Sequence, residues 1–160
     1  MNPLVLRAIL AALPLLGFAR RIQNGFVYGI VGAGFFIAAI FTFLLIRTFL
    51  PRTAERLSFL LLLLVLAMAA EKFFSVSLFM FASLLLLAPP ELFQKRKHWK
   101  GVARNAIWTS FVFSIFLTAH GFFSEWLGLG AGIKFFQHPA GSYFLAGLVL
   151  AGFPQSRSKK

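Results

Sequence analysis

A long apolar stretch runs from Gly25 to Phe49 and contains one charged residue, Arg47. A helix needs ~20 apolar residues to cross a bilayer, so this stretch is long enough to span with tilt. Further apolar segments lie on both sides of it, and only 12% of the 160 residues are charged. Such a chain has too few charged groups to cover a soluble domain. The sequence therefore predicts an all-α integral membrane protein.

Prolines break the apolar pattern at two related places. Pro14 and Gly17 fall inside the first apolar segment, and Pro89 and Pro90 follow the fourth. Proline removes a backbone donor, and in lipid the freed carbonyl needs a partner within protein. Pro14 and Pro89 are 75 residues apart, and the same offset relates Phe18 to Phe93, Arg20 to Lys95 and Arg21 to Arg96. We interpret the chain as two related halves, each opening with an interrupted helix.

Six spans are predicted, at 3–18, 25–49, 57–70, 73–88, 105–127 and 140–153. They form a single polytopic membrane domain, 1–160, with repeat one at about 1–72, repeat two at about 73–153 and a basic tail at 154–160. The third and fourth spans are short and are separated by Glu71-Lys72. Two short helices with a turn at Glu71-Lys72 are preferred over one long helix, because two charges at mid-bilayer are costly and local thinning accommodates short spans.

The basic residues are distributed unevenly between the predicted loops. Eleven fall on one side of the membrane and four on the other, so the positive-inside rule places both termini in the cytoplasm. The net charge of +12 is thus assigned to span ends and lipid headgroups, and no nucleic-acid partner is predicted. With three spans per half, the second half enters from the opposite side, which is the pattern of an inverted repeat.

Several short motifs recur in an order that is known from one family. They are Asn2-Pro3-Leu4-Val5-Leu6, Leu13-Pro14-Leu15-Leu16-Gly17, the glycine-rich 25–44, Glu91-x-Phe93, Glu125-x-Leu127-Gly128 and the stretch 135–141. In this order the chain resembles the six-helix membrane subunits of the Rnf and Nqr electron-transport complexes, in particular Rnf subunits E and A and Nqr subunits D and E. The resemblance covers nearly the whole chain.

The resemblance implies a fold, a location and partners. The fold is six transmembrane helices as two inverted three-helix repeats with interrupted first and fourth helices, in the bacterial inner membrane. In the family, two such subunits pair and each gives two cysteines to a [2Fe-2S] cluster. The complex couples electron transfer to ion movement. The expected partners are therefore other integral membrane subunits, among them a homologous six-helix subunit, and lipids.

This chain departs from the family at the cluster ligands. It contains no cysteine, and the equivalent positions are Leu13 and, at about the second, Leu84. Leucine has no lone pair for iron, so no cofactor and no metal is expected in this chain. The predicted function is a non-catalytic or accessory subunit without enzymatic activity of its own. The alternatives are a small inverted-repeat transporter or channel, and a structural membrane subunit of a larger assembly.

Two polar residues of the fifth segment are the candidates for chemistry. His120 is an ionisable residue within a span, which suggests contact with a proton path or a quinone. Bonding to a neighbouring carbonyl is the structural alternative. Glu125, near the end of the span, is a candidate to contact an ion or a proton, and pairing with Lys134 or Arg20 is its structural alternative. No nucleophile–base set, carboxylate pair or phosphate-binding glycine loop is present.

Overall fold

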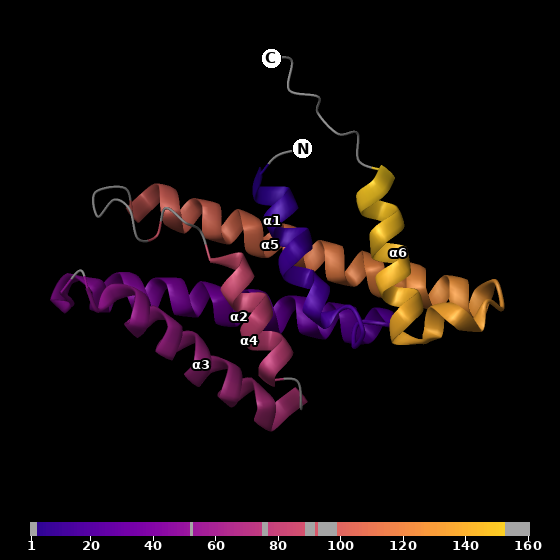
Figure 1. The fold of residues 1–160 in the computed structure, drawn as a ribbon, viewed down its shortest axis with the longest axis horizontal. Coiled ribbons are helices and arrows are strands. Elements are labelled where there is room, and N and C mark those ends of the chain that lie inside the picture. Colours follow the sequence, from indigo (N-terminus) through magenta and orange to yellow (C-terminus); the bar gives the residue numbers. More distant parts are fainter. Residues whose placement is uncertain (1–2, 52, 75–76, 89–91, 93–98, 153–160) are drawn as a thin grey trace, which may run out of the picture.

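The computed structural model describes residues 3–51, 53–74, 77–88, 92 and 99–152, and across them the chain is all-helical. This confirms the predicted all-α class. The α-helices are α1 (Pro3–Ala12), α2 (Ile22–Ile46), α3 (Glu55–Phe74), α4 (Ser77–Leu87), α5 (Trp99–Glu125) and α6 (Pro139–Gly152) (Figure 1). The shorter helical segments are η1 (Leu13–Leu15), η2 (Arg47–Phe49), η5 (Trp126–Gly130), which is a π-helix, and η6 (Lys134–Gln137).

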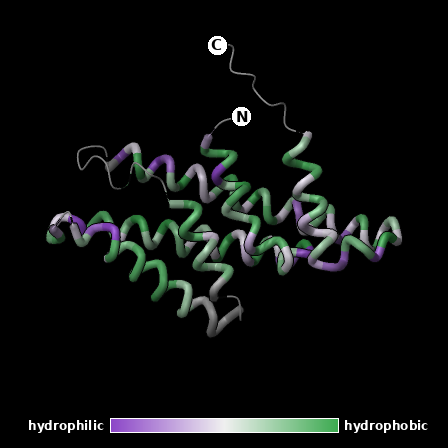
Figure 2. The backbone as a smooth tube through the Cα atoms, in the orientation of Figure 1, coloured by the Kyte–Doolittle hydropathy of each residue, from purple (hydrophilic) through white to green (hydrophobic). Residues whose placement is uncertain are grey.

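The two longest helices, α2 and α5, pack along each other and form the body of the molecule (Figure 1). With their short extensions, at Ile22–Phe49 and Lys100–Gly130, they are the two helices among the described residues that are long and apolar enough to cross a membrane. Figure 2 shows that apolar residues fill their middle and that hydrophilic residues gather toward their ends. This pattern is the one expected for association with a membrane. The segments Pro3–Leu15 and Pro139–Gly152 are apolar but shorter.

Glycines allow α2 and α5 to approach closely. Gly25, Gly29 and Gly32 are buried on one face of α2, at the spacing that places residues on the same side of a helix. A Cβ at Gly25 would collide with the backbone carbonyl oxygen of Leu117, and one at Gly29 would lie 3.0 Å from the Ser114 Cα. The Ser114 Oγ donates a hydrogen bond of 2.7 Å to the carbonyl oxygen of Gly29. Small residues therefore set the distance between these two helices.

We expect Gly25→Ala to destabilise the protein by about 1–3 kcal/mol, the usual cost of overpacking, because the backbone of α5 cannot move aside. Gly34→Ala is the matched control, since no atom lies within 4 Å of a Cβ at that position of the same helix. Alanine is the better helix former, so the control is expected to gain roughly 0.5–1 kcal/mol. Titration of the detergent-solubilised protein with SDS measures both changes. Equal effects of the two substitutions would contradict the close approach.

The first apolar segment ends where its proline and glycine lie. α1 stops at Ala12, and Pro14 lies in the 3-10 turn η1 that follows. The Ala19 N–H donates to the carbonyl oxygen of Leu15, and no α-helix begins again before Ile22. The break therefore turns the chain into α2 rather than dividing one continuing helix. In the second half α4 ends at Leu87, and Pro89 and Pro90 lie outside the described residues.

Two predicted boundaries are wrong. α3 continues through Glu71 and Lys72 to Phe74, and α4 begins at Ser77. Both charged residues are good helix formers and neither glycine nor proline follows them, so nothing ends the helix there. Two separate helices are nevertheless present, and they pack against each other.

The other error is at the start of α5. The fifth span is predicted to begin at residue 105, but α5 begins at Trp99. Val102, Ala103 and Ala106 are buried, and this packing extends the helix beyond the apolar stretch.

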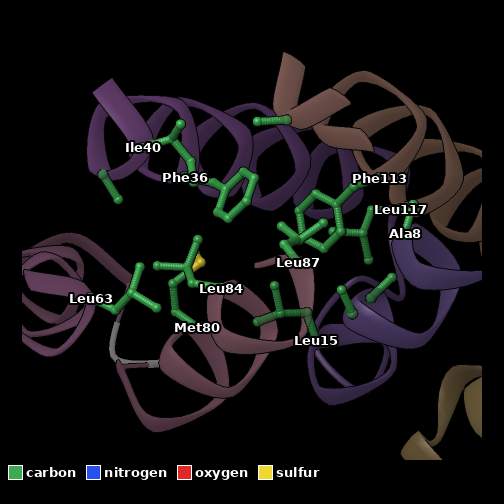
Figure 3. Close-up of a cluster of buried hydrophobic side chains, with 14 of the residues drawn as sticks. Ala8, Leu15, Phe36, Ile40, Leu63, Met80, Leu84, Leu87, Phe113 and Leu117 are labelled. Carbon is green, nitrogen blue, oxygen red and sulfur yellow. The ribbon is translucent and has the colours of Figure 1, made fainter. Parts of the chain in front are cut away.

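The apolar core lies where α1, α2, α3, α4 and α5 meet. Figure 3 shows Met80, Leu84 and Leu87 of α4 close to side chains from the other elements. The core includes Ala8, Leu15, Phe36, Ile40, Leu63, Phe113 and Leu117. α1 packs mainly on α4 and α5, and α4 also contacts α2. The two sequence halves therefore share one core.

Candidate functional site

A polar cavity lies at the end of the molecule where α2 begins and α5 ends. Its volume is about 360 Å³, and it is lined by Arg20, Arg21, Asn24, Glu125, Leu129 and Gln137. The two arginines belong to the short connection before α2, and Gln137 belongs to η6. This volume lies within the usual range of ~300–1,000 Å³ for small-molecule sites.

Hydrogen bonds to backbone carbonyls hold the walls of this cavity. The Arg20 Nη1 donates a 2.6 Å bond to the carbonyl oxygen of Gln137. The Asn24 Nδ2 donates a 3.3 Å bond to the carbonyl oxygen of Phe18. The Ser124 Oγ donates a 2.7 Å bond to the carbonyl oxygen of Phe136. These hydrogen bonds hold the connection before α2 and the segment after α5 in place, so the cavity walls have a defined arrangement.

Glu125 caps the start of α2. Its Oε2 accepts a 2.9 Å hydrogen bond from the backbone N–H of Ile22, the first residue of that helix. A carboxylate is favoured here because the first turn of a helix has unpaired N–H groups and a partial positive charge. Within the described residues Glu125 forms no ion pair within 4 Å with Lys134 or Arg20. Ion contact by Glu125 stays a prediction, and the two guanidinium groups in its cavity make an anion the better match.

His120 lies away from this cavity. Its side chain is buried in α5 and stacks on Phe116, with ring centroids 6.3 Å apart. The Nε2 is buried and has no hydrogen-bond partner. This nitrogen therefore does not make the hydrogen bond to a neighbouring carbonyl that was the structural alternative for His120, and such an unpaired polar atom is costly. His120 and Glu125 were both predicted from one segment, but the structure does not bring them into one site.

The two positions that the resemblance would match to cluster cysteines, Leu13 and Leu84, lie in apolar surroundings. Leu84 is fully buried in the core, and Leu13 is half-buried against it. η1, which contains Leu13, packs on α4, which contains Leu84. Within the described part of the chain no group of three or more His, Cys, Asp or Glu side chains is placed to hold a metal ion. The donor chemistry at Leu13 and Leu84 does not fit an iron–sulfur cluster.

A buried ion pair lies at the opposite end of α2. The Arg47 Nε is 3.1 Å from the Glu55 Oε2, and the two side chains are 7% and 5% exposed. The sequence predicts no ion pair here: Arg47 falls within the predicted second span and Glu55 lies just before the third. Their pairing joins η2, which directly follows α2, to the first residue of α3. The opposite charges eight residues apart were the sequence signal for it.

Comparisons with family models, with curated proteins and with solved structures found no match for this chain.

Proposed function

We propose that this chain is a non-catalytic membrane subunit of a redox-driven, ion-translocating electron-transport complex of the Rnf/Nqr type. It crosses the bacterial inner membrane six times, as two inverted three-helix repeats, with both termini in the cytoplasm. Its partners are other integral membrane subunits, including a second six-helix subunit, and lipids. Its role is to hold the complex together, since the positions that the resemblance matches to the family's cluster cysteines are leucines here.

The observation that carries this proposal is the contact between η1 and α4. The opening helix of each half ends in the shared core, and Leu13 and Leu84 belong to these two elements. The resemblance implies that the opening helices meet at the level of the cluster. The leucines at the contact between η1 and α4 support the proposal that this subunit packs within the complex but does not carry electrons.

The contacts between helices of different halves support the proposed repeat. α1 of the first half packs on α5 of the second, and α4 of the second half packs on α2 of the first. An inverted repeat requires both contacts, because its symmetry exchanges α1 with α4 and α2 with α5. The third helices follow this pattern only in part: α3 packs on α2 as α6 packs on α5, but α3 packs more closely on α4, and α6 has no comparable contact with α1 among the described residues.

The test is purification of the tagged chain from its own membrane in mild detergent, followed by mass spectrometry of the chains that copurify. We expect a second six-helix membrane subunit together with redox proteins, and an unrelated tagged inner-membrane protein is the control. A chain that runs alone contradicts the proposal. That result favours the alternative of a small transporter or channel, for which the unpartnered His120 is the side chain to replace.

A further inference from the structure

We infer that the protein holds an anionic phospholipid, with the phosphate in the cavity at Arg20 and Arg21 and one acyl chain in the groove between α2 and α5. This inference does not depend on the proposed redox partnership. It rests on the charge of the cavity, on the groove that adjoins it and on the position of the cavity at the end of an apolar helix.

The charge of the cavity selects an anion. Two guanidinium groups and one carboxylate line it, and the carboxylate is engaged with the N–H of Ile22. Within the described residues no carboxylate lies within 4 Å of either guanidinium group. The net charge of these groups is +1, which matches the single negative charge of a phosphodiester. Arginine binds phosphate through two parallel N–H bonds, and the amide of Asn24 adds a further donor.

An apolar groove begins beside the cavity. Its volume is about 870 Å³, and it runs between α2 and α5. It reaches the cavity at Ile22, which lines the groove while its N–H binds Glu125. From Ile22 to Ile37 the groove extends roughly 22 Å at the rise of an α-helix. One leaflet of the hydrocarbon core is about 15 Å thick, so the groove is long enough for an acyl chain.

The floor of the groove is apolar although three hydroxyl residues line it. The Ser110 Oγ donates to the carbonyl oxygen of Ala106, and the Thr118 Oγ1 donates to that of Ser114. The Ser114 Oγ is bonded to Gly29, as described above. All three hydroxyl hydrogens are used within the two helices, so the groove offers a hydrocarbon surface. Phe26, Phe111, Phe122 and Phe123 form its exposed walls.

The position of the two sites fits a lipid better than a soluble anion. α2 is one of the two helices that are apolar enough to cross a membrane, and Arg20 and Arg21 directly precede it. Arginines at the end of a spanning helix lie at the level of the phosphate groups. A phosphate bound there leaves its acyl chains at the depth of the groove.

The test measures retention of phosphatidylglycerol by the detergent-purified protein, using native mass spectrometry. We expect Arg21→Gln to weaken retention about tenfold, since it removes a charged group that binds phosphate through two parallel N–H bonds. Arg104→Gln removes the same charge from an exposed site on α5 and is expected to change retention less than twofold. Ala119→Trp fills the groove and is also expected to release the lipid. Gly147→Trp, at an open position of α6, is its control.

Inorganic phosphate, tested by calorimetry, separates a lipid from a soluble anion. The inference is supported if the protein retains the lipid and also binds phosphate weakly. This phosphate binding should be lost in Arg21→Gln and should remain in Ala119→Trp. Phosphate binding without lipid retention overturns the inference in favour of a soluble anion. If Arg21→Gln and Arg104→Gln reduce lipid retention equally, or if the two tryptophan variants do, the lipid binds non-specifically and the inference is overturned. Because Ala119→Trp leaves both arginines in place, misfolding of Arg21→Gln does not prevent a decision.

Discussion

Replacing Glu55 by leucine is expected to lower the free energy of unfolding by about 3–5 kcal/mol, because it leaves the Arg47 guanidinium buried without this carboxylate. Arg47 is 6% exposed and cannot reach water without moving the end of α2. SDS titration of the solubilised protein measures the loss.

The double variant Arg47→Met with Glu55→Leu is the control for this result. Replacing both members of a buried pair by apolar side chains of similar volume is often neutral or stabilising. We therefore expect most of the lost stability to return in the double variant. A double variant as unstable as Glu55→Leu alone would show that the pair is not the source of the effect.

Leu84→Ala is expected to destabilise the protein by about 2–5 kcal/mol, the range for truncation of a fully buried leucine. In a lipid environment the loss arises from the cavity and the missing contacts, because a lipid tail is as apolar as leucine. Leu84 is 0% exposed, and Leu86 on the same helix is 47% exposed. Leu86→Ala is therefore the matched control, with an expected change below about 1 kcal/mol. Thermal unfolding followed by circular dichroism measures the stability of both variants. Equal losses of stability would contradict the assignment of Leu84 to the core.

The sequence was sufficient to predict the helical class and the two long helices. α2 and α5 come from apolar stretches that leave no other element possible at that length. The ends of helices were harder, since Trp99–Arg104 contains polar residues that are also good helix formers. Its helical state depends on the burial of Val102 and Ala103, and this packing is a tertiary effect that hydropathy does not show.

The candidate site could be predicted only in part. Glu125 was identified from its place near the end of a span, and the structure puts it in a polar cavity. The contacts that make the cavity join residues far apart in the chain, such as Arg20 and Gln137, which are 117 residues apart. No local pattern encodes such a contact, because it results from the packing of α5 and η6 against the connection before α2.

The cap that Glu125 gives to α2 has a consequence for biosynthesis. The donor N–H belongs to Ile22, and its acceptor lies 103 residues downstream. Because α2 is synthesised before α5, the amide of Ile22 has no Glu125 acceptor until the end of α5 has been made. A chain truncated before Glu125 therefore lacks this cap on the first turn of α2.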